Sequence, residues 1–244
     1  MPEPHPLLAH FTAASEGRFP PCDGGVTVLP PLPGGLECSV AFTGHAVVAT
    51  ALPAAEVHAG RPDGFGASLA PDFLRRLAGP EGWIDTIDVT LAAHGTGGPP
   101  RLAERTEGTD THPRVLRARE LRDDVTVHGD ERGLVTLAEG LAGRRELSIE
   151  LDAPHEAGRG RGRGLLTDAL SLVPDGEPVF AAVAPGNARS LRAFLACGFI
   201  PIGSEALLRP RRHGTGGGFR PAPAGPLRVS NHPGASPGGG PGGG

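Results

Sequence analysis

The run Arg159-Gly160-Arg161-Gly162-Arg163-Gly164-Leu165-Leu166 decides the fold because of what lies on either side of it. A β-rich segment, 146–152, precedes it, and an apolar stripe with a 3.6-residue period begins within it and continues to Val173. This order predicts a strand, a glycine-rich loop and a helix over 165–172. A helix N-terminus presents N–H groups and the positive end of the helix dipole, and glycine lets an anion approach them. The run is therefore a candidate phosphate-binding site.

The spacing of these glycines excludes two common nucleotide-binding sites. A Walker loop needs a lysine after its last glycine, and the chain contains no lysine. The dinucleotide pattern G-x-G-x-x-G cannot be placed on these glycines, and the preceding strands are expected to form a meander instead of a βαβ unit. An RGG-like RNA-binding tract and a purely structural turn stay open as alternatives.

Outward from this run, apolar periodicity and turn residues predict an α+β chain. The segments 125–128, 134–138 and 146–152 are separated by short turns, which predicts an antiparallel meander. The other expected strands are 26–29, 38–42, 46–52, 83–93 and 179–184, with shorter pieces at 199–202 and 206–208. Besides 165–172, the expected helices are 6–14, 69–77, 113–122 and 188–196.

Two motifs resemble those of one known family. Arg159-x-x-Gly162-x-Gly164 is similar to the Q/R-x-x-G-x-G/A pyrophosphate loop of the GNAT acetyltransferases. The run 187–199 is similar to the second motif of that family through Asn187, Ser190, Phe194, Gly198 and Phe199. The motifs stand in the family's order, separated by one expected helix and one expected strand. The resemblance covers about 113–208 and is closest to actinobacterial GNAT-like proteins of unassigned substrate.

The resemblance implies an α+β GNAT fold, with a central mixed, mostly antiparallel sheet flanked by helices and an N-terminal α/β extension. It divides the chain into an N-terminal region, 1–112, that completes or flanks the sheet, and an acetyl-CoA-binding core, 113–209. The remaining residues, 210–244, are rich in Gly, Pro and Arg. Such a segment buries too little apolar surface to offset its ordering entropy, so we expect a disordered tail.

The resemblance also implies the chemistry: acetyl-CoA is the co-substrate, and its acetyl group passes to an amine by direct attack, without a metal. Loop amides would hold the pyrophosphate, and the strand end would pair with the pantetheine arm. Asn187 also suits the N-cap of the helix it precedes. The implied cofactor-binding residues are Leu151, Ala153, Arg159, Gly160, Arg161, Gly162, Arg163, Gly164, Leu165, Asn187, Ser190 and Phe194.

The chain departs from the family where a tyrosine often protonates the leaving thiolate, because Phe194 stands there. Water, Cys197 or unassisted departure would replace that step. Glu150 is the candidate general base; its alternative is an ordinary solvated carboxylate, and Glu146 and Asp152 share its strand face. His45, at the expected hairpin turn, is a candidate on the acceptor side; its alternative is an exposed turn histidine. A catalytically weak or inactive acyl-CoA-binding sensor or regulatory protein is the alternative function.

The charge, the apolar runs and the cysteines of the chain indicate which partners and which cellular location to expect. A formal net charge of −4 argues against a nucleic-acid binder that works through bulk electrostatics. No run approaches the roughly 20 apolar residues that span a bilayer, and no signal peptide is expected. Three widely spaced cysteines favour a reducing cytoplasm over disulfides or a zinc site. We expect acetyl-CoA and an amine acceptor as partners, not nucleic acid or a membrane; a homodimer stays open.

Overall fold

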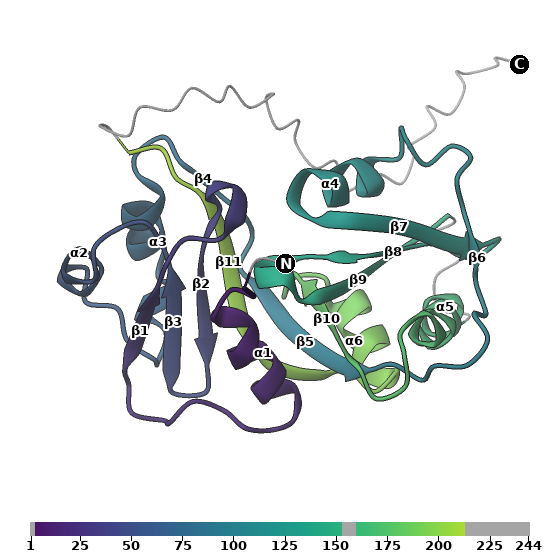
Figure 1. Cartoon of the computed structure of the whole chain (residues 1–244), viewed down its shortest axis with the longest axis horizontal. Helices are drawn as coiled ribbons and strands as arrows, with labels where there is room; N and C mark the ends of the chain where they lie inside the picture. The colour runs from purple at the N-terminus through teal and green to yellow at the C-terminus, as the bar shows by residue number, and fades with distance from the viewer. Residues whose placement is uncertain (1–2, 153–159, 213–244) are drawn as a thin grey trace, which may run out of the picture. The chain divides into compact units, whose positions relative to one another are not determined.

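One mixed β-sheet runs through the computed structural model, which describes residues 3–152 and 160–212 (Figure 1). Its strand order is β1-β3-β2-β11-β5-β10-β9-β8-β7-β6, and β4 pairs with β11. The strands are β1 (Val26–Leu29), β2 (Glu37–Phe42), β3 (His45–Ala49), β4 (Trp83–Ile84), β5 (Asp88–His94), β6 (Ala103–Glu104), β7 (Asp123–Asp130), β8 (Gly133–Glu139), β9 (Arg145–Leu151), β10 (Pro178–Val183) and β11 (Ile200–Arg209).

The sheet confirms the predicted α+β class, because β1 with β3 and β9 with β10 are its parallel pairs and the other pairs are antiparallel. The expected meander is present as β7, β8 and β9. β5 lies between β10 and β11, so a strand from the N-terminal half stands inside the C-terminal part of the sheet. The described residues, 3–152 and 160–212, accordingly belong to one compact unit.

Helices cover both faces of the sheet. Side chains alternate along β10: Val179 and Ala181 pack in a core cluster with Leu165 of α5 and Phe194 of α6, whereas Phe180 packs with α1 on the opposite face. A smaller apolar cluster joins α4 to β7 and β8. The helices are α1 (Leu7–Ser15), α2 (Ala54–Ala59), α3 (Pro71–Ala78), α4 (Pro113–Leu121), α5 (Arg161–Ala169) and α6 (Ala188–Ala196), with short 3₁₀ turns at Pro33–Gly35, Ala67–Leu69, Leu141–Gly143 and Leu170–Leu172.

The expected elements differ most from the observed ones at three places. The helix expected over 165–172 begins at Arg161, so Gly162 and Gly164 lie in its first turn and not in a loop. The strand expected over 83–93 is broken into β4 and β5, which pair with different parts of β11. The two pieces expected at 199–202 and 206–208 are one strand, β11. Gly203 lets it continue, because a Cβ there would lie 2.4 Å from the carbonyl oxygen of Ala41.

The chain beyond β11 is held for a few residues. The backbone N–H of Arg211 donates to the carbonyl oxygen of Ala78 (2.7 Å), and the Arg212 guanidinium pairs with the buried Glu37 carboxylate. Of the tail expected to be disordered over 210–244, residues 213–244 lie outside the described residues. Within the described ranges, no helix is long and apolar enough to cross a membrane.

Candidate functional site

The central feature of the candidate site is a parallel strand pair that separates after one position. β9 and β10 pair only at Glu146 and Phe180 among the described residues. Beyond that position, β9 runs on to Leu151 and β10 to Val183 without further pairing between them. The facing edges of two such strands offer backbone N–H and C=O groups to an extended ligand, as an open sheet edge does.

The N-terminus of α5 stands beside the end of β9. Gly160 precedes the helix with φ +78°, a left-handed conformation that glycine adopts without strain. A Cβ built on Gly162 would lie 3.7 Å from Cδ1 of Leu151, which places the first turn against the last residue of β9. The N–H of Gly164 donates to the carbonyl oxygen of Gly160 (2.9 Å), so the N–H groups of Gly162 and Arg163 precede the first intrahelical bond.

The arginine side chains around this helix differ in their contacts and in their exposure. Nη2 of Arg161 donates to the carbonyl oxygen of Glu131 (2.5 Å). Arg132 binds Asp130 and Asp168, the second at 2.6 Å. The side chain of Arg163 is exposed at the first turn of α5. Ala153 and Arg159, both predicted to contact the cofactor, lie outside the described residues.

The second motif forms α6, which lies next to α5 (Figure 1). Asn187 is its N-cap, as predicted: Oδ1 accepts the N–H of Ser190 at 3.1 Å. Phe194 is buried in the core and packs edge-on against Phe199, with 4.8 Å between the ring centroids. Contacts of Asn187, Ser190 and Phe194 with a coenzyme stay predictions.

The acidic residues of β9 occupy very different environments. The Glu150 carboxylate is 45% exposed and binds Arg114 of α4 at 2.8 Å. Glu146 is buried and binds Arg122 (2.7 Å) and Arg144 (2.9 Å). Burial alone would raise the pKa of the Glu146 carboxyl, but the two guanidinium groups outweigh it and hold that pKa below its usual range. Glu146 is therefore a charged structural group and a poor proton acceptor.

Arg144 is a buried arginine that no sequence pattern singled out. Its guanidinium lies 4.3 Å from the Phe11 ring centroid and 5.6 Å from that of Phe180, and it binds Glu205 of β11 at 2.6 Å. Together with its bond to Glu146, these contacts place a charged cluster at the last paired position of β9 and β10, on the face opposite α5. Only the tertiary structure brings residues 11, 144 and 205 together.

His45, the candidate on the acceptor side, lies elsewhere. Its ring is buried, with Nδ1 2.8 Å from Oδ1 of Asp23 and Nε2 2.9 Å from Oγ1 of Thr27. β3, which begins at His45, is separated from β9 by β2, β11, β5 and β10. His45 is thus a satisfied polar group of the N-terminal strands, neither an exposed turn residue nor a neighbour of the separated pair.

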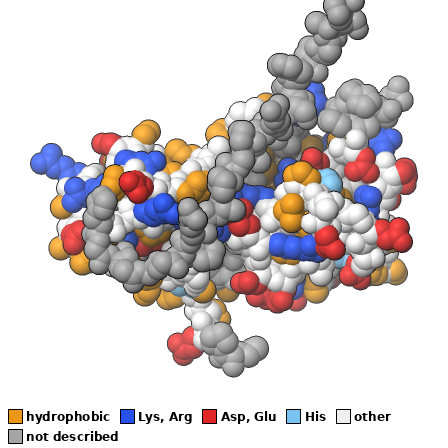
Figure 2. Space-filling view, turned by 90° about the horizontal axis from the view of Figure 1, so that it is seen from above, with side chains coloured by type: hydrophobic (Ala, Val, Ile, Leu, Met, Phe, Trp, Pro, Cys, Tyr) orange, Lys and Arg blue, Asp and Glu red, His pale blue; other side chains and the backbone are white. Residues whose placement is uncertain are grey.

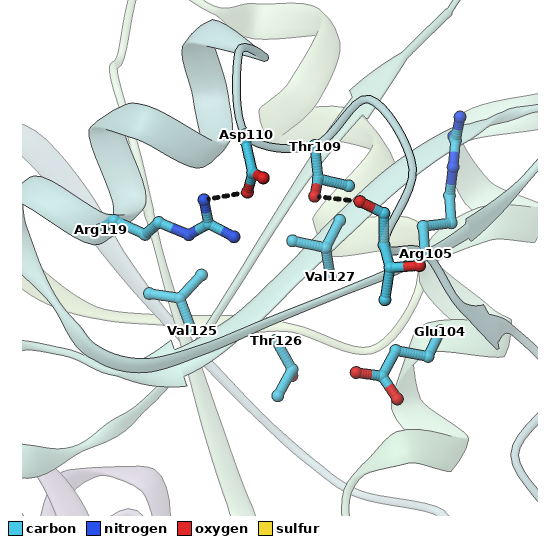
Figure 3. Close-up of a pocket in the computed structure, with 9 residues that line it drawn as sticks. Glu104, Arg105, Thr109, Asp110, Arg119, Val125, Thr126 and Val127 are labelled. Atoms are coloured by element: carbon cyan, nitrogen blue, oxygen red, sulfur yellow. Dashed lines mark hydrogen bonds and ion pairs between the residues drawn. The ribbon is translucent and has the colours of Figure 1, made fainter.

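Two cavities lie along β7, away from α5. The first, about 230 Å³, is shown in Figure 3, with the Arg119–Asp110 ion pair (2.7 Å) at one end and Thr109, which donates to Thr106, facing it. The second, about 220 Å³, involves Asp124 and Arg145. Neither cavity is lined by residues of the first turn of α5 or of the second motif. Among the described residues, no set of three or more His, Cys, Asp and Glu side chains could hold a metal ion.

In Figure 2, basic and acidic side chains are interspersed with apolar ones over the part of the surface drawn in colour. No protein-family model matches the chain, and no curated protein matches it. Among solved structures, one from Novosphingobium aromaticivorans DSM 12444, assigned as an acetyltransferase of the GNAT family, is similar over 55% of this chain and 69% of its own, with 16% sequence identity and a TM-score of 0.37. A likeness at that level leaves the function to the geometry of the site.

Proposed function

We propose that the chain is a GNAT-type N-acetyltransferase that moves the acetyl group of acetyl-CoA to an amine. One observation carries the proposal: β9 and β10 separate after a single paired position, beside a helix whose first turn is rich in glycine. A pantetheine arm is an extended chain of amides, which suits an unpaired strand edge. A pyrophosphate is an anion, which suits a helix N-terminus. The two features adjoin at Leu151 and Gly162.

Each predicted residue within the described ranges has a role in this proposal. The N–H groups ahead of Gly164, at Arg161, Gly162 and Arg163, bind the pyrophosphate, and Gly160 lets the chain enter the helix. Leu165 anchors α5 in the core. The backbone at Leu151 pairs with pantetheine and polarises the thioester carbonyl, an oxyanion-type contribution. Asn187 and Ser190 border the arm from α6, and Phe194 supports it from the core. The predicted cofactor contacts of Ala153 and Arg159 fall outside the described residues.

The reaction proceeds by direct attack. A neutral amine attacks the thioester carbon, the C–N bond forms, the C–S bond breaks, and the thiolate leaves with a proton from the amine or from water. The buried ring of Phe194 cannot donate that proton. Loss of one general acid costs about 10²–10⁴-fold in rate, which slows turnover without abolishing it. Glu150 is the β9 candidate for the base, with its carboxylate held by Arg114.

A sensor that binds acyl-CoA without efficient turnover is the second candidate function, and the buried Phe194 favours it. Both functions place the protein in the cytoplasm with acetyl-CoA and no resident metal. Only the acetyltransferase function requires an amine acceptor. A homodimer is compatible with either.

The test is acetyl-CoA binding by calorimetry on the wild type, Gly162→Asn and Gly162→Asp. The two variants have the same shape and differ in charge. A carboxylate in the first helical turn favours the helix but repels a pyrophosphate, so Gly162→Asp should bind at least tenfold more weakly than Gly162→Asn while unfolding at the same or a higher temperature.

Thiol release over a panel of amines then separates transferase from sensor. Failure of the wild type to bind acetyl-CoA would reject both functions. Equal affinity of Gly162→Asp and the wild type would reject the pyrophosphate site at α5.

A further inference from the structure

Asp88 is the first residue of β5, the strand next to β10. β10 and β9 are the parallel strands that separate after one paired position. The next residue, Val89, is in register with Val183 of β10, and Asp88 itself is opposite Glu205 of β11. Val89 packs with the α5 and α6 cluster, so by alternation the Asp88 side chain points to the opposite face. This is the face on which Arg144 binds Glu205 and Glu146.

Every neighbouring carboxylate on this face has an arginine partner. Glu146 and Glu205 bind Arg144, and Asp85, just before β5, binds Arg117 of α4 at 2.8 Å. Within the described residues, no arginine binds Asp88. Its Oδ1 is buried and has no hydrogen-bond partner. A buried acceptor without a partner costs free energy unless a ligand or water supplies the donor.

The electrostatics make this carboxyl a proton acceptor at neutral pH. Burial raises the pKa of Asp88 to about 7, and the negative charges of Glu205, Asp85 and Glu146 act in the same direction, against a lowering hydrogen bond from Thr86. Proton transfer is most efficient when the pKa of the catalytic group lies near the working pH. The same negative surroundings attract a cationic amine.

β10 is the strand between Asp88 and the gap. On this face β10 presents Phe180 and then Ala182, whose partner on β5 is Thr90. The hydroxyl of Thr90 already has a partner, because its Oγ1 donates a hydrogen bond to Glu205 (2.6 Å). Adjacent strands are about 4.8 Å apart, so the edge of the gap lies roughly 10 Å from Asp88, with β10 between them.

We infer that Asp88 is the general base of the proposed transfer, accepting a proton on its carboxylate from the ammonium group of the acceptor. The inference rests on the proposed function. The first ammonium proton passes to Asp88 and then to solvent. The neutral amine attacks, the C–N bond forms and the C–S bond breaks. The second proton passes to the departing thiolate, so coenzyme A leaves as the thiol. The acceptor is thus an amine that arrives as its ammonium ion.

The test compares wild type, Asp88→Asn, Glu150→Gln and, as the matched control, Asp175→Asn in an exposed turn. Calorimetry measures acetyl-CoA affinity, and thiol release measures kcat and its pH profile. Asp88→Asn should keep the acetyl-CoA affinity within about threefold and lose about 10²–10⁴-fold in kcat, together with the rise of the wild-type rate through about pH 7. Asp175→Asn should match the wild type in both.

A second readout needs no activity. The folded-state pKa of Asp88 is raised, so its stabilising contribution is present at low pH and is lost as the pH rises through about 7. The free energy of unfolding of Asp88→Asn, relative to wild type, should therefore increase between about pH 4 and 8. This change also shows that the variant folds.

The outcomes separate the two claims. Turnover by Asp88→Asn with the wild-type rate and pH profile would overturn the inference and leave the acetyltransferase standing, as would loss of the pH-dependent rise in Glu150→Gln alone. A wild type that binds acetyl-CoA but acetylates no amine would overturn the inference in favour of the sensor. A wild type that does not bind acetyl-CoA would overturn the proposed function itself.

Discussion

Arg144 holds two carboxylates, Glu146 and Glu205, where water is excluded. Arg144→Ala leaves both without that partner and should lower the free energy of unfolding by about 3–5 kcal/mol, measured by urea denaturation. The control is Arg145→Ala, the next residue, whose pair with Glu177 is about 40% exposed and should contribute less than about 1 kcal/mol. Equal losses for the two variants would contradict the central place given to Arg144.

The cysteines make a second residue-scale prediction. Burial raises the pKa of the Cys38 thiol to about 12, and the Glu205 charge adds to the effect, whereas Cys22 is exposed. A thiol reacts as the thiolate, so a maleimide or disulfide reagent should label Cys22 in the native protein and reach Cys38 only after denaturation. Mass spectrometry of the labelled peptides measures this. Rapid native labelling of Cys38 would contradict its burial.

At the scale of elements, the N-cap residue Asn187 stabilises the start of α6. Asn187→Ala removes the acceptor for the Ser190 N–H and should cost about 1 kcal/mol of stability, while Asn187→Asp keeps a good cap and should cost little. Thermal unfolding measures both. Acetyl-CoA affinity then separates the two roles of Asn187: an affinity unchanged in both variants means that the residue is only a cap, and an affinity lost in both means that it contacts the coenzyme.

α6 and α5 show why one helix could be bounded from the sequence and the other could not. Asn187 and Gly198 bracket an unbroken helical pattern, and the observed bounds are those expected. In α5 the apolar stripe begins only at Leu165, and glycines at 162 and 164 disfavour a helix by intrinsic propensity. The helix nevertheless starts at Arg161, because its first turn packs against Leu151 of β9. Packing outweighs propensity there.

For the whole molecule, the C-terminal strand stabilises N-terminal elements. Arg212, just past β11, binds Glu37 of β2, which is buried and also accepts from Thr50. Arg212→Ala should lower the free energy of unfolding by about 3 kcal/mol in a single cooperative transition. Arg211→Ala, whose side chain is exposed, is the control and should change stability by less than about 0.5 kcal/mol. Two separate transitions would contradict the shared sheet.

The sequence alone determined the class of the fold and the candidate phosphate site, because both rest on local patterns. Alternation and turn residues indicate the meander, and glycines that alternate with arginines ahead of an expected helix indicate an anion site. These signals depend on residues close together in the chain, where backbone geometry links neighbours directly.

Only the tertiary structure decided which carboxyls are free to act. Glu150, the candidate from the sequence, pairs with Arg114, and the Glu146 carboxylate forms ion pairs with Arg122 and Arg144. Asp88 becomes a proton acceptor because β5 is inserted between β10 and β11, opposite Glu205. Proton affinity depends on burial and on nearby charges, and here the largest of those charges, on Glu205, comes from a residue more than a hundred positions away, which no local pattern records.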